Sequence, residues 1–299
     1  MTNHIVTRQD LETKLKEIED YVNKNGDPKY GVFGPNSMMW KIGQESIIFL
    51  GSGYALLMQE AHPWVATGAH HHSKVKSDPT GRWKRTFQAV NTLIFGDLQQ
   101  AFKMSRMVFN IHSKVHGKLD EHGGGQYHAN NEDALMWVAA TLCYTSIWMY
   151  EIGVGVLSRE EKEQYYQEYK RFCYMFGISD QTIPKDWDDF IRYYNNIIYS
   201  GVYNKHLSVK GYGKELLGHF IKKYDNKFHP LNIPSEVFMI MTSNFLPTDV
   251  RNQYGLKFGL KETLIAEAIL ITIRNTYHRI PIEVRKNPYF RSAMKEMGL

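Results

Sequence analysis

Residues 134–150 read ALMWVAATLCYTSIWMY and contain no charged side chain, and this stretch decides the fold class. Its 17 residues are at the lower limit for crossing a hydrocarbon core of about 30 Å, and no basic flank accompanies them. A helix that is apolar on all sides can instead be buried on all sides by other helices. We therefore predict a central buried helix and no stable membrane insertion.

The composition is that of a folded globular protein, with 43% hydrophobic and 22% charged residues over 299 positions. The net charge of +5 is spread among interleaved Lys and Glu, so no nucleic acid partner is expected. Cys143 and Cys173 are too few for a disulfide framework or a zinc-thiolate site. The first two dozen residues contain no apolar core of a signal peptide, which predicts a cytoplasmic location.

Helical patterns extend outward from the central segment in both directions. Thr7 and Asp10 form a capping box before a helix that should end near Asn25, and Ser158 and Glu161 form a second box. Further helices are predicted at 82–95, 98–116 and 261–279. Because strand alternation is scarce, we predict one all-α domain, residues 1–299, with an N-terminal helix and loop at 1–33 and a core at 34–299.

The predicted helix 98–116 carries two histidines one turn apart, in the stretch FNIHSKVHG at 109–117. His112 is at the margin of an apolar stripe and should point toward the core. His116 should lie in the last helical turn, where a partly charged imidazole is favoured. A buried His112 can be a hydrogen-bonded core residue or an axial ligand of a haem iron. The residues of the stripe are Ala101, Met104, Met107, Val108, Ile111 and Val115.

Arg82, Arg85 and Thr86 share one helical face, which continues into apolar Ala89 and Leu93. Arginines are rarely buried without partners, so the carboxylates of a cofactor such as haem could neutralise these two. Alternatively, both side chains extend to solvent at the start of their helix.

The run His70-His71-His72 could suggest a metal site. Consecutive residues of a regular element point in different directions, however, so three neighbours cannot close a tetrahedral site by themselves. We interpret the run as a surface feature and keep His72 as a candidate for proton transfer.

Several blocks of the chain, in order, resemble the helical oxygenases that include the latex-clearing rubber oxygenases and the mycophenolic-acid pathway oxygenase MpaB. The similarity extends from about residue 34 to near the end. The blocks are GSGYALLMQEAHPWVATG (51–68), GRWKRT (81–86), NIHSKVHG (110–117), YHANNEDALMWVAATL (127–142), LSREEKEQYYQEYKRF (157–172) and FLPTDVRNQYGLKFG (245–259).

The resemblance implies a helical pocket, globin-like in a general sense, that encloses a non-covalent haem b. It implies that His112 is the proximal iron ligand and that Arg82, Arg85 and Thr86 lie on the oxygen-binding side or at the haem edge. Known members of this family use dioxygen to cleave carbon–carbon double bonds in isoprenoid chains. His116 receives no role.

Three positions depart from the family pattern. Arg85 replaces a lysine, and a guanidinium has no lone pair for a metal, so the sixth iron position is expected to be open or water-bound. No carboxylate lies between Glu60 and Asp78 where the rubber enzymes have a glutamate, so His71 or His72 would have to take its place. Ala139 stands where a histidine is frequent.

The resulting hypothesis is a haem b-dependent oxygenase that uses dioxygen on a small apolar substrate of alkene or isoprenoid type. The alternative is a haem-binding protein without turnover, such as a sensor, a carrier or a weak peroxidase. A third alternative is a helical interaction protein whose histidines are structural.

Overall fold

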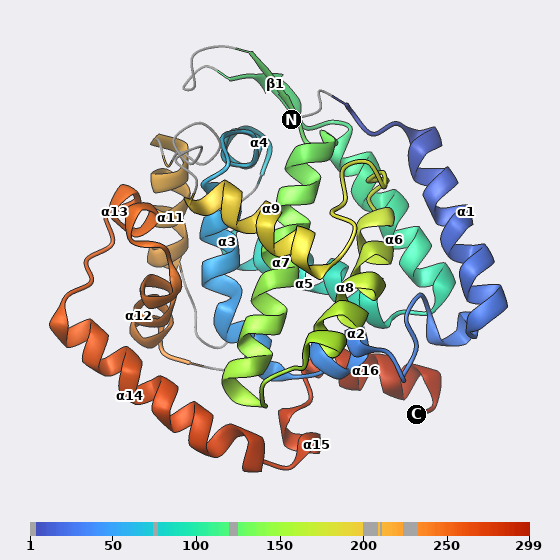
Figure 1. Cartoon of the computed structure of the whole chain (residues 1–299). Coiled ribbons are helices and arrows are strands. Elements are labelled where there is room, and N and C mark those ends of the chain that lie inside the picture. The colour runs from blue at the N-terminus through green and yellow to red at the C-terminus, as the bar shows by residue number, and fades with distance from the viewer. Residues whose placement is uncertain (1–3, 74–76, 120–124, 200–208, 210, 224–232) are drawn as a thin grey trace.

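The computed structural model describes residues 4–73, 77–119, 125–199, 209, 211–223 and 233–299 (Figure 1). Within these ranges the regular structure is helical apart from one short hairpin, which confirms the predicted all-α domain. The predicted division at residue 34 stays a prediction. The α-helices are α1 (Arg8–Asn25), α2 (Met38–Gly43), α3 (Ser52–Glu60), α4 (Pro63–His72), α5 (Pro79–Phe95), α6 (Leu98–His112), α7 (Glu132–Gly153), α8 (Arg159–Tyr174), α9 (Trp187–Tyr199), α11 (Gly211–Lys223), α12 (Ser235–Phe245), α13 (Thr248–Tyr254), α14 (Leu260–Thr276), α15 (Ile282–Arg285) and α16 (Pro288–Met297).

Short elements connect some of these helices. They are the 3-10 helices η1 (Pro28–Tyr30), η2 (Ser46–Gly51) and η5 (Tyr277–Arg279), and the antiparallel strands β1 (His116–Lys118) and β2 (Gln126–His128).

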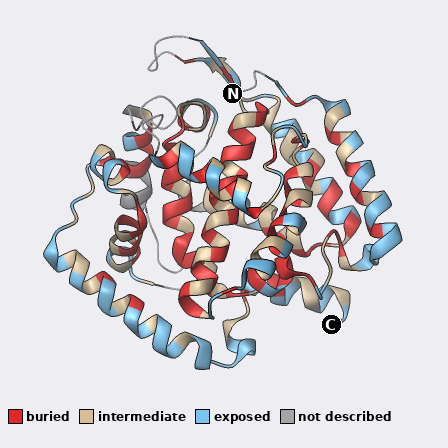
Figure 2. Cartoon of the chain, viewed as in Figure 1, coloured by how far each residue is buried: buried red, intermediate tan, exposed pale blue. Residues whose placement is uncertain are grey.

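The uncharged segment lies within α7, which is buried along its whole length (Figure 2). Helices α3, α8 and α14 and the turn η2 all pack against it. The indole of Trp137 donates to the Met58 carbonyl oxygen at 3.0 Å, and the Tyr169 hydroxyl donates to the Ala139 carbonyl oxygen at 2.8 Å. The prediction of a central buried helix is confirmed. Among the described residues, no helix combines the length and apolarity that a membrane span needs.

Two glycines allow this close packing. A Cβ on Gly51 would overlap Cγ2 of Thr145, on α7, and a Cβ on Gly53 would overlap Oγ1 of Thr242, on α12. Both glycines therefore let the backbone of η2 and α3 approach neighbouring helices more closely than any larger residue would allow.

Local sequence signals located several helix boundaries correctly. Both predicted capping boxes are present, at Thr7 before α1 and at Ser158 before α8. Helix α1 ends at Asn25 as expected. Helix α14 covers most of the predicted 261–279 segment, and the last three residues of that segment form η5. Helix α5 starts at Pro79, three residues before the predicted start, because Asp78 caps it through the backbone N–H of Gly81.

The predicted helix 98–116 is too long. Helix α6 ends at His112, and the chain then turns so that the backbone N–H of Val115 donates to the His112 carbonyl oxygen at 2.9 Å. His116 lies in β1 and pairs with His128 of β2, so it is not a helix-terminal histidine. The predicted apolar stripe of this helix is only partly correct. Ala101 is buried and Met104 and Val108 are half-buried, but Met107 and Ile111 are exposed. Phe102 and Ser105, which lie outside the predicted stripe, face the core.

The close approach at Gly53 gives a stability prediction. Gly53→Ala should lower the free energy of unfolding by about 1–3 kcal/mol, because the added methyl group overpacks the contact with α12. Gly218 lies within α11, and a Cβ there would meet no described atom within 4 Å, so Gly218→Ala should be neutral or stabilising by up to about 1 kcal/mol. Chemical denaturation of both variants measures the difference, and equal stabilities would contradict the assigned contact.

Candidate active site

A partly buried ion pair joins Glu60, the last residue of α3, to Arg82, in the first turns of α5. Both terminal nitrogens of Arg82 lie 3.3 Å from Oε1 of Glu60. The Glu60 side chain is only 3% exposed. Its second oxygen, Oε2, is buried and has no hydrogen-bond partner in the part of the chain that the structure describes.

Burial raises the pKa of Glu60, and the charge of Arg82 opposes this rise. Because its pKa is raised, this carboxyl group takes up a proton more readily than an exposed one, and its free oxygen can accept a hydrogen bond from a ligand. In the sequence, Glu60 stands out only as the last acidic residue before a stretch without carboxylates. The available signal was its position at the end of an apolar helix, directly before Ala61-His62-Pro63.

Arg85 and Thr86 lie on the same face of α5 as Arg82 but are exposed. The Arg85 guanidinium donates to Oδ2 of Asp78 at 3.1 Å, and the Thr86 hydroxyl donates to the Arg82 carbonyl oxygen at 3.1 Å. Both arginines thus have carboxylate partners within the protein. Neither arginine therefore requires the carboxylates of a cofactor to neutralise it, Arg85 extends to solvent, and the shared face is present.

His112 lies at the end of α6 beside Asn130, which follows β2. The pKa of His112 is lowered to about 4, mainly by burial and also by the nearby His128, while a hydrogen bond with the Asn130 side chain opposes the shift. The ring is therefore neutral at pH 7. Asn130 is itself fixed, because its Nδ2 donates to the Ser113 hydroxyl at 3.0 Å. The arrangement gives a neutral imidazole whose orientation is set by a second side chain, as in many metal-binding histidines.

His112 and Arg82 lie toward the same end of the helical hairpin that α5 and α6 form. Helices α5 and α6 are joined by Gly96-Asp97 and pack against each other, so they run antiparallel. Arg82 lies before this turn and His112 lies after it. The distance along the helix from the turn is nearly equal for the two residues, roughly 20 Å at a helical rise of about 1.5 Å per residue. Both residues therefore lie at the end of the hairpin that is remote from the turn.

The remaining histidines lie elsewhere. His72 is exposed at the end of α4, where its Nε2 is 3.0 Å from the Tyr127 hydroxyl oxygen, and it lines a groove on the outer face of α6. His71 lies 3.2 Å from the hydroxyl oxygen of Tyr212. The rings of His116 and His128 stack across the hairpin with centroids 5.7 Å apart. The structure thus groups His72 with the surface of α6 that faces away from His112.

The family model described as "ER-bound oxygenase mpaB/B'/Rubber oxygenase, catalytic domain" matches residues 39–275. This range covers most of the chain and includes Glu60, Arg82 and His112, so the protein belongs to this family of oxygenases. Searches of curated proteins and of solved structures gave no significant match.

Membership confirms the resemblance noted in the sequence blocks and assigns the chain to the oxidoreductases. The catalytic domain of an oxygenase is an enzyme, so the predicted enzyme class is also confirmed. The match concerns the domain as a whole. The roles of single residues are proposals, and they concern His112, Arg82, Arg85, Thr86 and His72.

The buried ion pair gives a second stability prediction. Arg82→Gln should lower the free energy of unfolding by about 3 kcal/mol at pH 8, because Glu60 is left as an unpaired buried charge. The folded-state pKa of Glu60 already lies above its unfolded value. Protonation of Glu60 therefore stabilises the folded variant at low pH. The loss of stability in Arg82→Gln grows as the pH rises through the folded-state pKa of Glu60.

Two controls accompany this measurement. The double variant Glu60→Gln/Arg82→Gln should regain most of the lost stability, because no buried charge remains. Arg85→Gln, which removes an exposed partner of Asp78, should cost at most about 1 kcal/mol. Denaturation curves at pH 5 and pH 8 test the prediction, and a pH-independent loss in Arg82→Gln would contradict it.

Proposed function

We propose that the protein is a haem b-dependent oxygenase that acts with dioxygen on a small apolar substrate of alkene or isoprenoid type. The observation that carries the proposal is the neutral, oriented imidazole of His112 inside the matched oxygenase domain. The family description names rubber oxygenases, which supports an alkene as the substrate class. A cytoplasmic location stays a prediction.

The donor set fits a haem iron. An axial histidine must be neutral, so that one ring nitrogen offers its lone pair, and its other nitrogen usually holds a hydrogen-bonded partner. His112 meets the first requirement through its lowered pKa and the second through Asn130. When bound, the haem would supply an iron centre that binds and activates dioxygen. Arg85 cannot serve as a ligand, because a guanidinium has no lone pair to offer.

The residues at the start of α5 would orient the small polar reactant. Arg82 is held in place by Glu60. Arg85 and Thr86 are exposed on the same face, and their donors would turn to the reactant from their present partners, Asp78 and the Arg82 carbonyl oxygen. Donors fixed in advance lose little freedom during the reaction and can stabilise developing negative charge. The apolar residues of the interior would exclude water and favour an apolar substrate.

Glu60 is better suited than His72 to hold a proton beside Arg82. Its carboxyl group is buried, its pKa is raised, and Oε2 has no partner among the described residues. His72 is exposed and its Nε2 is near the Tyr127 hydroxyl. We therefore propose that Glu60 takes the role of the glutamate of the rubber enzymes, which has no counterpart between Glu60 and Asp78. His72 remains the alternative.

The role of His112 can be tested by haem content. His112→Ala should lose most of the haem during purification, because the neutral nitrogen ligand is removed. His116→Ala should retain haem at the wild-type level, because His116 lies in β1 with its ring stacked on His128. The ratio of haem absorbance to protein concentration measures both variants. Equal haem content in wild type and His112→Ala would overturn the assignment.

Oxygen uptake with a short polyisoprenoid alkene separates an oxygenase from a haem protein without turnover. Thr86→Ala should slow substrate-dependent uptake by roughly 5- to 150-fold, the loss of a hydrogen bond worth about 1–3 kcal/mol. Thr272→Ala is the matched control, because Thr272 is also exposed and also donates to the carbonyl oxygen four residues earlier. Wild-type uptake that does not depend on the alkene would favour the non-oxygenase alternative.

A further inference from the structure

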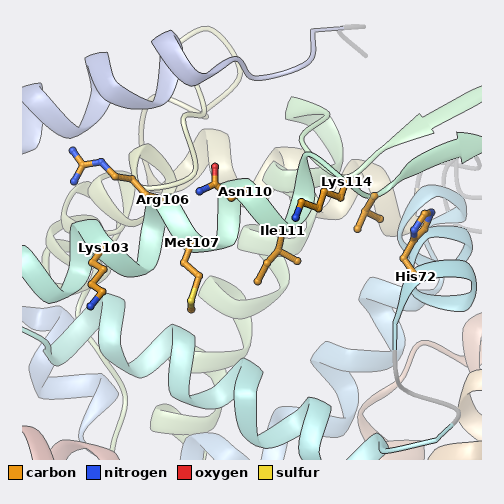
Figure 3. Close-up of a pocket in the computed structure, with 8 residues that line it drawn as sticks. His72, Lys103, Arg106, Met107, Asn110, Ile111 and Lys114 are labelled. Atoms are coloured by element: carbon orange, nitrogen blue, oxygen red, sulfur yellow. The ribbon is translucent and has the colours of Figure 1, made fainter.

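A groove of about 590 Å³ lies along the outer face of α6 (Figure 3). Its volume is within the usual range for small-molecule sites, about 300–1,000 Å³. Lys103 and Arg106 lie at one end, and Lys114 and His72 lie at the other end. Between them, the side chains of Met107 and Ile111 point to the same side of α6.

The groove faces away from His112. At about 100° per residue, Lys103 and Asn110, which both line the groove, lie roughly 180° and 200° around the helix from His112. The imidazole points to the core side, where Ala101 and Ser105 are buried. The groove is therefore separate from the proposed haem ligand.

The charge of the groove is positive. No acidic residue is among the described side chains that line it. The guanidinium of Arg106 is held by Glu12, with Nη2 2.7 Å from Oε2, so this end of the groove already has a carboxylate beside it. Within the described ranges Lys103 and Lys114 form no ion pair, and Lys114 has no acidic neighbour comparable to Glu12.

The floor of the groove is apolar and exposed. Met107 and Ile111 leave 47% and 55% of their surface in contact with solvent, although both belong to an amphipathic helix with a well-packed inner face. Single exposed apolar residues are common, but two adjacent ones between cations form a surface suited to an amphipathic ligand. An anionic head and an apolar chain would match these two features.

We propose that this groove binds a long-chain carboxylate, with its head group at Lys114, whose ammonium group points toward Ile111, and its chain along Ile111 and Met107. The head group belongs at this end because Glu12 lies beside Arg106 at the other end and would repel an anion there. The site requires neither haem nor the oxygenase reaction, so it goes beyond the proposed function.

Calorimetric titration of the purified protein with dodecanoate and with dodecanol tests the charge requirement. Dodecanoate should bind at one site, and dodecanol should bind at least tenfold more weakly. Lys114→Gln should weaken dodecanoate binding by about tenfold, whereas Lys261→Gln, an exposed lysine on α14, should bind like wild type. Equal affinities of wild type and Lys114→Gln would overturn the proposal.

A second pair of variants tests the apolar floor. Ile111→Glu should abolish dodecanoate binding, because it places a charge beneath the chain. Ile271→Glu is the matched control on α14, since Ile271 is also 55% exposed. His112→Ala should keep dodecanoate binding whatever its haem content, which separates this site from the haem proposal. Binding that survives in Ile111→Glu or disappears in His112→Ala would contradict the assigned position.

Discussion

The burial of α7 is the constraint on which the rest of the structure depends. The uncharged segment 134–150 of this helix must be covered, and segments from both halves of the chain provide this cover: η2 and α3 from the first half, α8 and α14 from the second. Close cover of α7 requires glycine at position 51, and glycine at position 53 lets α3 approach α12. Once α3 is held against α7 in this way, its last residue, Glu60, is buried and must meet a cation. The position of Arg82 therefore follows from the packing of α7.

Local patterns predicted what depends on local interactions. The capping boxes at Thr7 and Ser158 and the uncharged segment 134–150 within α7 are properties of neighbouring residues, and each was located from sequence. The end of α6 was not located from sequence. The segment after His112 leaves the helix and pairs with residues 126–128, beyond a stretch that includes three consecutive glycines. A preference for such a distant partner leaves no periodic signal.

In the candidate site, too, local features could be predicted and long-range contacts could not. The spacing of Arg82, Arg85 and Thr86 on one face and the inward direction of His112 could be read from helical periodicity. Their partners could not, because Glu60 and Asn130 belong to other elements and meet these residues only in the folded chain. Hydrophobic periodicity gave the inner face of α6 only in part, because Ala101 is buried as predicted but two other residues of the stripe are not. Met107 and Ile111 were assigned to the core because they are apolar, whereas the structure buries Phe102 and Ser105, and the Ser105 hydroxyl donates to the Met175 carbonyl oxygen at 2.5 Å.

The partly misplaced stripe explains why α6 has two faces that can each carry a function. A helix that buried its most apolar side would leave only cations and Asn110 on its surface, and such a surface would be ordinary. Because Phe102 and Ser105 lie on the inner side together with Ala101, Met107 and Ile111 remain outside beside Lys103 and Lys114. Leaving large apolar side chains in water costs free energy, roughly 25 cal/mol per Å² of apolar surface, which a bound apolar chain would recover. The same rotation of the helix turns His112 inward, where burial keeps its imidazole neutral. One choice of packing therefore produces both the inner ligand and the outer groove.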